Sequence, residues 1–360
     1  MKKIGSIVGG ILVFIGLALV LYFMEDEETA PSKEGTPTGD VLDVHFIDVG
    51  QGDAIALRSP SGKTMLIDGG KKSRGEDVVR FLREHGIETL DYVVATHPDA
   101  DHIGGLISVL EQMDVKTFID SGKVHTTQTY ARLLELIDAN DIEFVVPNNG
   151  DPIDFDPNVT MQVVNAVKEA SNNNEASIVL YATYGDVSFL LTGDADVSIE
   201  RDMLTRYELP TTVLKAGHHG SDTSSDPQFM KQIASEVVIL SYGEGNSYGH
   251  PHSRVLQTIE EVGATAYSTA TEGDITVRTD GQSYEVAAQP FDLEESDERL
   301  NINEATQEQL EELPGIGPAT AQKIIDYRSV QPFETVEQLM EVDGIGPKTF
   351  DALQSSIRVK

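Results

Sequence analysis

The residue types that bind metals lie at the ends of apolar segments in this chain of 360 residues. HPDADH, which begins at His97, follows the apolar run LDYVV and contains two histidines and two aspartates. FLLTGD ends at Asp194, LKAGHHGS contains His218 and His219, and SYGEGNSYGHPH contains His250. A strand that ends in a carboxylate or an imidazole places that group at one edge of a sheet, so several such strands can build a metal cluster from distant residues. The pattern predicts a metallohydrolase.

The reaction expected of such a cluster is hydrolysis. Divalent metals lower the pKa of bound water toward 7 and so generate a hydroxide that attacks phosphorus or a carbonyl carbon. The chain has no cysteine, which excludes thiol catalysis and disulfides, and no Ser-His-Asp arrangement offers another nucleophile. Zinc is the metal expected for histidine and aspartate ligands, while manganese or magnesium also suits an oxygen-rich set.

The elements that must position these residues alternate between strands and helices. VLDVHFIDV and DAIALRS alternate apolar and polar residues as half-buried strands do, and TMLID is a further strand that ends at Asp68. EDVVRFLREHG and TYARLLELIDAN have helical spacing and end at Gly86 and Asn140. This order predicts one layered α/β domain over residues 41–288.

Seven motifs occur in the order found in one known family. They are FIDVGQGDA, LIDGG, HPDADH, NEASIVL, LLTGD, LKAGHHGS and SYGEGNSYGHPH. Together they resemble the metallo-β-lactamase superfamily, and the H-x-D-x-D-H form of the loop resembles competence proteins of the ComEC (Rec2) type. The resemblance implies an αββα sandwich with two divalent metal ions.

Carried over residue by residue, the resemblance implies two unequal metal sites. One would be held by His97, Asp99 and Asp194, and the other by Asp101, His102, Asp194 and His250. Asp194 would bridge the two ions. The histidine that the superfamily usually supplies between the loop and Asp194 is missing, so Asn174 or a water would fill that position.

Other motif residues would act around the ligands. The expected catalytic residues are Asp101, His218 and Lys215. His218, favoured over His219, would complete a metal shell or protonate the leaving group, and Lys215 would offset charge on a phosphate. Asp53, Asp68, His219 and Asn174 are expected to stand behind the ligands and to orient them.

The first 24 residues predict a membrane anchor. Two lysines precede an uncharged run over residues 4–24, which is followed at once by EDEE. At about 1.5 Å per residue this run spans roughly 31 Å, enough for a bilayer core. The charges predict an N-terminus in the cytoplasm and a body outside the cell. A cleaved signal, which would release a secreted protein, and a buried core helix are the alternatives. Residues 25–40 read as a tether.

A small helical domain is expected over residues 300–360, after a linker over 289–299. LPGIGPATAQKII is echoed by VDGIGPKTFDAL, and capping-box pairs, Thr306 with Gln309 and Thr335 with Gln338, mark helix starts before each turn. The repeat resembles tandem helix-hairpin-helix motifs of the ComEA type, which implies weak, non-sequence-specific DNA binding. The residues expected to contact DNA are Gly315, Gly317, Lys323, Gly344, Gly346 and Lys348.

The net charge of −34 argues against general attraction to nucleic acid, so DNA binding would depend on the residues of the two hairpin motifs. The combined hypothesis is a membrane-anchored, extracellular phosphodiesterase that cleaves DNA through a metal-bound hydroxide. Its expected partners are DNA, the membrane and the competence machinery. The alternatives are a hydrolase of another phosphodiester or acyl substrate, and a non-catalytic tethered DNA receptor.

Overall fold

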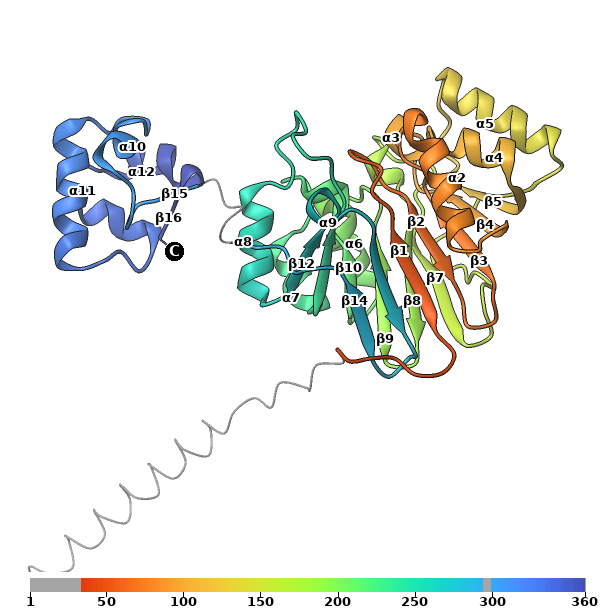
Figure 1. Cartoon of the computed structure of the whole chain (residues 1–360). Coiled ribbons are helices and arrows are strands. Elements are labelled where there is room, and N and C mark those ends of the chain that lie inside the picture. The colour runs from red at the N-terminus through yellow and green to blue at the C-terminus, as the bar shows by residue number, and fades with distance from the viewer. Residues whose placement is uncertain (1–33, 294–298, 360) are drawn as a thin grey trace, which may run out of the picture. The chain divides into compact units, whose positions relative to one another are not determined.

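The computed structural model describes residues 34–293 and 299–359, which are drawn as a coloured ribbon in Figure 1. The predicted anchor over residues 4–24 and most of the predicted tether lie outside the described residues. Within the described ranges, no helix has the length and apolar character needed to cross a membrane.

Two mixed sheets form the centre of the hydrolase domain. The first sheet contains β1 (Leu42–Phe46), β2 (Ile55–Arg58), β3 (Thr64–Ile67), β4 (Thr89–Ala95), β5 (Asp114–Asp120), β6 (Glu143–Val145), β13 (Ile275–Thr279) and β14 (Tyr284–Ala287). Its strand order is β14-β13-β1-β2-β3-β4-β5-β6, with parallel pairing from β3 to β6. The second sheet contains β7 (Val159–Asn165), β8 (Val179–Tyr184), β9 (Val187–Leu191), β10 (Val213–Lys215), β11 (Val237–Leu240) and β12 (Thr265–Ser268). Its order is β12-β11-β10-β9-β8-β7, with parallel pairing from β9 to β12.

Helices cover the outer face of each sheet (Figure 1). Those on the first sheet are α2 (Gly75–Glu84), α3 (Ala100–Ile103), α4 (Leu106–Gln112) and α5 (Gln128–Ala139). Those that follow strands of the second sheet are α6 (Val197–Arg206), α7 (Pro227–Ile233), α8 (Ser253–Val262) and the short α9 (Thr269–Glu272). Three separate apolar cores fill the spaces between these layers, one between the sheets and one beneath each set of helices. The layers are those of the predicted αββα sandwich, and α2 and α5 confirm the two helices predicted from periodicity.

The alternation of apolar and polar residues in β1 does not produce a half-exposed strand. All five of its residues are buried, because β1 lies between β13 and β2 in a sheet covered on both faces. Its polar residues are paired instead of solvated: Asp43 forms ion pairs with Arg58 and Arg278, and His45 shares a hydrogen bond of 2.8 Å with Thr276. The pattern correctly marked a strand but not its depth.

The hydrolase domain extends beyond the predicted boundaries at both ends. Gly35 donates its backbone N–H to Tyr284, and Thr38 donates to Asp280, so the end of the predicted tether is attached to the β13–β14 hairpin. In the predicted linker, Gln289 donates to Glu272 and Phe291 to the carbonyl of Ala266. Residues 289–293 therefore belong to the hydrolase domain.

Residues 300–358 form a small domain with its own core. Its elements are β15 (Leu300–Asn301), α10 (Gln307–Glu311), α11 (Pro318–Val330), η4 (Val336–Glu341), α12 (Pro347–Leu353), η5 (Gln354–Ser356) and β16 (Ile357–Arg358). Both predicted capping boxes are present. Gly315 and Gly344 have φ angles of 82° and 108°, which favour glycine, and a Cβ added at either would lie within van der Waals distance of a threonine in the other copy of the repeat.

Candidate metal centre

The carboxyl ends of strands from both sheets meet at one edge of the hydrolase domain. β4 leads into the loop that carries His97, β9 leads to Asp194, and β10 leads into η3 (Gly217–Gly220), which carries His218 and His219. β11 leads into the loop that ends at His250. These segments are distant in sequence, and parallel strand order brings them together, as the sequence pattern predicted.

Asp194 lies at the centre of the cluster. Its Oδ2 is 3.3 Å from His102 Nε2 and 3.7 Å from the Nε2 atoms of both His97 and His218. Its Oδ1 is 3.5 Å from His219 Nε2. Two ligand atoms bound at about 2.0–2.1 Å to one tetrahedral zinc ion stand roughly 3.3 Å apart, so these separations suit shared coordination.

The buried atoms that face one another here lack hydrogen-bond partners. Nε2 of His97, His102 and His219, together with Asp194 Oδ1, are inaccessible to solvent and make no hydrogen bond. Burying unpaired polar atoms costs free energy, and a cation among them would supply the missing partner. Asp53, His102, Asp194 and His219 each offer one atom, all within 4.8 Å of one another. The residues present therefore fit a divalent metal.

Asp68 orients two of these histidines. Its Oδ2 accepts hydrogen bonds from His102 Nδ1 at 2.8 Å and from Thr96 Oγ1 at 2.7 Å, and Oδ1 accepts from the Thr96 backbone N–H. Thr96 Oγ1 in turn lies 3.0 Å from His97 Nδ1. Holding a proton on Nδ1 makes Nε2 the nitrogen of each imidazole that a metal can bind, which is the role expected of Asp68.

The charges at the centre are strongly coupled. Burial alone would lower the pKa of His102, but the carboxylates of Asp194 and Asp68 outweigh it and raise that pKa well above its usual value. Burial would likewise raise the pKa of Asp194, but His102 and His219 hold it well below its usual range. Asp194 therefore carries its negative charge at neutral pH.

Lys215 does not face a substrate, contrary to the role predicted from sequence. Its side chain is fully buried, its Nζ lies 2.5 Å from Asp53 Oδ2, and it donates to the carbonyl of Gly193 at 3.0 Å. Burial would raise the pKa of Asp53, but Lys215 keeps it lowered. A lysine enclosed in this way cannot reach a phosphate, and it instead neutralises Asp53 behind the cluster.

The two histidines of η3 have an unusual backbone. His218 and His219 have φ angles of 46° and 57°, a left-handed conformation that is unfavourable for two successive residues with side chains. This turn directs both imidazoles toward Asp194. His219 was expected only behind the ligands, but it is buried with its Nε2 in the cluster, whereas the side chain of His218 remains 26% exposed.

The loop that follows η3 is held by a buried acid. Glu200 of α6 accepts hydrogen bonds from the backbone N–H groups of Ser225 and Asp226, and Arg254 of α8 donates to carbonyls of the same loop. Burial raises the pKa of Glu200 to about 7. Nothing in the sequence motifs singled out this residue.

Asp99 and Asp101 lie at the open side of the cluster. Asp99 Oδ2 is 3.5 Å from His97 Nε2, and the nearby His97 imidazole lowers the pKa of Asp99 to about 2 despite partial burial. Asp101 is 4.0 Å from His219. Asn174 was expected to replace the histidine that the first predicted site lacks. Its Nδ2 instead contacts His218 at 3.3 Å. Its neighbour Asn173, which the sequence did not single out, donates to Asp99 Oδ1 at 2.6 Å.

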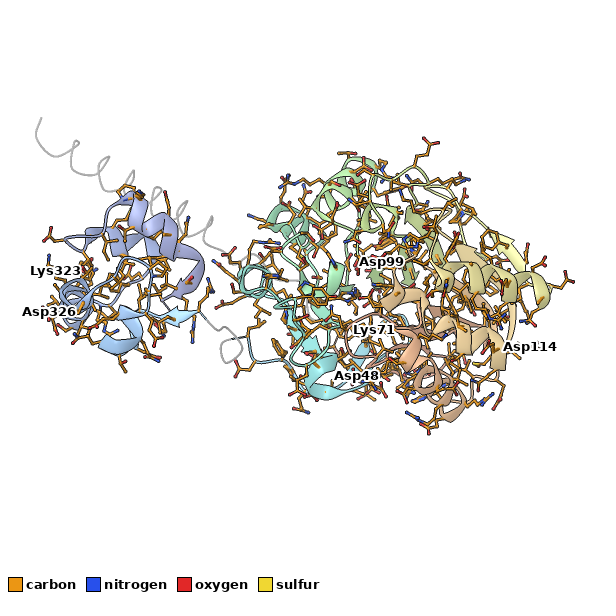
Figure 2. The ribbon with its side chains drawn as sticks, turned by 90° about the horizontal axis from the view of Figure 1, so that it is seen from above. Asp48, Lys71, Asp99, Asp114, Lys323 and Asp326 are labelled. Carbon is orange, nitrogen blue, oxygen red and sulfur yellow. The ribbon has the colours of Figure 1, made fainter. Side chains whose placement is uncertain are left out.

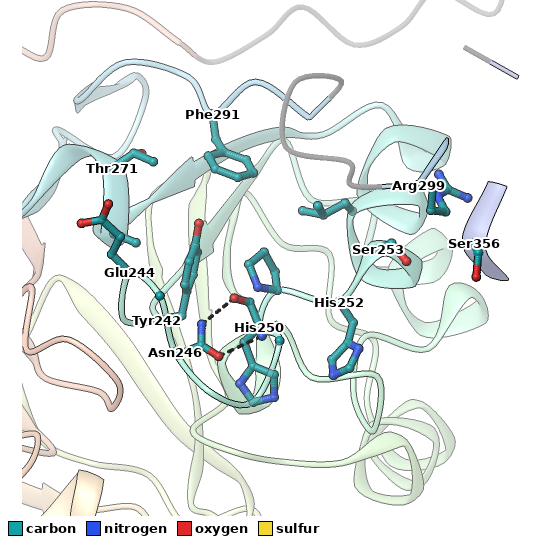
Figure 3. Close-up of a pocket in the computed structure, with 15 residues that line it drawn as sticks. Tyr242, Glu244, Asn246, His250, His252, Ser253, Thr271, Phe291, Arg299 and Ser356 are labelled. Carbon is teal, nitrogen blue, oxygen red and sulfur yellow. Dashed lines mark hydrogen bonds between the residues drawn. The ribbon is translucent and has the colours of Figure 1, made fainter. Parts of the chain in front are cut away.

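His250 lies at the outer side of this cluster. Its ring centroid is 5.6 Å from that of His218 and 6.2 Å from that of His219, and Gln51 contacts its Nδ1 at 3.2 Å. Burial and the neighbouring imidazoles lower the pKa of His250 to about 4, so it is neutral and able to act as a ligand at pH 7. Figure 3 shows how Asn246 holds the backbone of His250 in this loop.

A basic segment adjoins the metal-binding loop. Lys71 and Lys72, at the start of η1 (Lys72–Arg74), are exposed, and within the described part of the chain neither forms an ion pair or a side-chain hydrogen bond. Gly104 packs so closely on this segment that an added Cβ would lie 2.5 Å from the Lys72 backbone nitrogen. Figure 2 labels Lys71 and, on the metal-binding loop, Asp99. These lysines lie outside the motifs that marked the metal ligands.

Family comparison agrees with this geometry. Residues 47–244 match the model of the metallo-beta-lactamase superfamily, which is more than half of the chain. The chain belongs to this superfamily. Residues 295–358 match the helix-hairpin-helix motif. The fold and the cluster together support a metal-dependent hydrolase.

Curated relatives of this superfamily member include competence proteins. The chain is 30% identical to ComE operon protein 3 of Bacillus subtilis over 255 residues, covering 66% of this chain and 33% of that protein. It is 28% identical to competence protein ComA of Neisseria gonorrhoeae, covering 63% and 30% of the two chains. The chain thus spans about a third of the length of these relatives. Its C-terminal part is 39% identical over 62 residues to ComE operon protein 1 of Bacillus subtilis, covering 17% of this chain and 30% of that protein.

Proposed function

We propose that this protein is a membrane-anchored, extracellular phosphodiesterase that cleaves DNA with bound divalent metal. The observation that carries the proposal is the convergence of unpartnered Nε2 atoms of His97, His102 and His219 on Asp194. The segment with the exposed Lys71 and Lys72 packs on Gly104, which follows the metal-binding loop. Metal-binding chemistry and exposed lysines that attract anions together suit a phosphodiester substrate. Zinc fits the ligand set, and manganese is compatible with its carboxylates.

The residues of the cluster divide into holding and acting groups. One metal would be held by His97, His102, Asp194 and His219. A second ion would share Asp194 and take its other ligands from Asp99, Asp101, His218 and His250. A divalent ion at this position supplies positive charge and lowers the pKa of water. A substrate can reach the imidazole of His218, because this side chain is partly exposed. Its Nδ1 contacts Thr223 at 2.9 Å.

The proposal is tested by hydrolysis with the purified full chain in detergent. Linear DNA, a bis-aryl phosphate and nitrocefin are offered with zinc or manganese, and cleavage of the first two is expected. His102→Ala should abolish cleavage, whereas His85→Ala, which removes an exposed histidine at the end of α2, should not. Hydrolysis of nitrocefin alone would instead indicate an acyl substrate, and no hydrolysis would indicate a tethered receptor.

Lys71 and Lys72 should contribute to substrate binding through their charge. We expect Lys71→Ala/Lys72→Ala to weaken DNA binding and to reduce the slope of log K against log salt by about 1.4 to 1.8, because each phosphate contact contributes about 0.7 to 0.9. Filter binding over a salt series measures this slope. Lys231→Ala is the matched control: this exposed lysine lies in the last turn of α7, which leads to the amino end of β11 and so to the opposite edge of the sheet. An equal slope for all three proteins would contradict the assignment.

The helix-hairpin-helix domain is proposed to bind the DNA backbone. Gly317 and Gly346 precede α11 and α12, and no atom lies within 4 Å of a Cβ added at either position. Lys323 is a weaker candidate than predicted, because it forms an ion pair of 2.6 Å with Asp343, while Lys348 is exposed.

Two double variants separate charge from shape at these turns. Gly317→Asp/Gly346→Asp should weaken DNA binding severalfold through repulsion of phosphate, whereas Gly317→Ala/Gly346→Ala should bind nearly as the parent does. Fluorescence anisotropy with labelled duplex measures both. Equal affinity of the aspartate variant and the parent would remove the hairpins from the interface.

A further inference from the structure

An exposed aromatic ring lies beside the metal centre. Tyr248 is 61% exposed, and it and Phe144 are the aromatic members of the large hydrophobic residues that the described part of the chain leaves exposed. Its ring centroid is 5.6 Å from that of His250, with 25° between the ring planes. His250 in turn lies 5.6 Å from His218. An aromatic surface therefore leads from solvent to the cluster.

The loop that carries Tyr248 is held in place by a single amide side chain. Asn246 Oδ1 accepts from the backbone N–H groups of Tyr248 at 3.1 Å and His250 at 3.0 Å. Its Nδ2 donates to the carbonyls of Gly243 at 3.0 Å and His250 at 2.7 Å (Figure 3). Both acceptor and both donor positions of the amide are used, so the loop is ordered before any substrate arrives.

The same loop is tied to the rest of the site. Gln51 Oε1 accepts from the backbone N–H of Gly243, and Gln51 Nε2 contacts His250 Nδ1. Gln51 belongs to the segment that packs against Asp101, since a Cβ added at Gly52 would lie 2.2 Å from the Asp101 carbonyl oxygen. Tyr248 is thus fixed relative to the metal ligands.

We propose that Tyr248 is a stacking platform for an unpaired nucleobase next to the scissile phosphate, so that the site takes single-stranded DNA in preference to duplex. This inference rests on the proposed function and adds its strand preference. Base stacking on an exposed aromatic ring is tolerant of sequence and requires a free base face. In a duplex both faces of each base are already stacked on neighbours, so the ring can bind a base only after unstacking it. A ring fixed in advance loses little conformational entropy on binding.

The absence of tryptophan from the chain gives a direct test. Tyr248→Trp in the full chain introduces a single indole at the proposed platform. Titration with an oligothymidylate in EDTA, where no cleavage takes place, should quench its fluorescence in a saturable way, and a blunt linear duplex should quench it much less. Binding of both DNAs without any change in fluorescence, or equal quenching by both, would overturn the proposal.

Substitutions at the same position distinguish stacking from packing. Tyr248→Phe should retain the affinity for the single strand, whereas Tyr248→Ala should lose about tenfold or more of it with little change for duplex. Phe144→Ala removes the other exposed aromatic, on β6, and serves as the matched control. Thermal melting checks that each variant is folded.

Failure of this inference is separable from failure of the proposed function. Quenching by single strands without DNA cleavage would reject the nuclease and retain the platform. Cleavage with the same ratio of single-strand to duplex rates in the parent and in Tyr248→Ala would retain the nuclease and reject the platform.

Discussion

At the scale of single residues, buried carboxylates set the state of the cluster. Asp68 accepts the Nδ1 proton of His102 and, through Thr96, orients His97. Asp53 is paired with Lys215, which keeps one negative charge of the centre neutralised. Each of these contacts lies behind the Nε2 atoms that face Asp194, so each acts on metal binding without touching a substrate.

Asp68→Asn should weaken metal binding about 10- to 100-fold while leaving the fold intact. The amide offers one acceptor and turns its NH₂ group toward hydrogen-bond donors, so His102 loses its fixed orientation. Competition with a chromophoric chelator measures the affinity. Asp186→Asn, at an exposed position between β8 and β9, is the control, and equal affinities for the two variants would refute the role of Asp68.

Lys215→Met should destabilise the hydrolase domain by about 3–5 kcal/mol, because it leaves the buried Asp53 carboxylate without its partner. Urea denaturation in EDTA gives the free energy of unfolding. The double variant Lys215→Met/Asp53→Asn should recover much of the loss, since the uncompensated charge is gone. A single variant as stable as the parent would show that the pair has no structural role.

At the scale of elements, β1 shows how burial changes the meaning of a pattern. His45 lies on β1 beneath α2, where its ring is 5.5 Å from that of Phe81. It is 4% exposed, and burial lowers its pKa to about 4. In the unfolded chain its pKa is about 6.5.

This difference makes stability depend on pH. Between pH 6.5 and 4 the unfolded state binds a proton that the folded state does not, so the free energy of unfolding falls as the pH falls, by up to about 3 kcal/mol from this residue. Above pH 6.5 both states are neutral and the effect is absent. His45→Gln should therefore lose less stability over this range than the parent, as measured by urea denaturation at several pH values. His125→Gln, which removes a histidine from a surface turn, should follow the parent curve.

At the scale of the whole molecule, the metal couples both sheets. The ligands come from the ends of β4 in the first sheet and of β9 and β10 in the second, so bound metal joins the two layers. The helix-hairpin-helix domain has a separate core and supplies none of these ligands. Metal should therefore act on the stability of one domain only.

Addition of zinc should raise the melting temperature of the hydrolase domain, and EDTA should lower it. Metal at 100 times its dissociation constant contributes about 2.7 kcal/mol to the folded state. Differential scanning calorimetry should show this shift in the larger transition, with no shift in that of the small domain. The His102→Ala variant should show almost no shift, and an equal shift in that variant would place the metal elsewhere.

The sequence by itself determined what depends on residue type and local spacing. The order of the motifs identified the sandwich and the edge where the ligands collect, and Gly-x-Gly-Pro turns with capping boxes identified the two hairpins because these signals act within a few residues. The position of Asp68 at the end of its strand predicts a supporting role, and its hydrogen bonds to Thr96 and His102 agree with that role.

The tertiary structure alone decided which side chains face one another. Lys215 and His219 exchanged their expected positions, because the last residue of β10 points into the interior and the left-handed turn after it directs His219 toward Asp194. The packing of the Lys72 segment on Gly104 and the stacking of Tyr248 on His250 also depend on folding. Side-chain direction follows from backbone dihedral angles and packing between layers, and neither is encoded in local spacing.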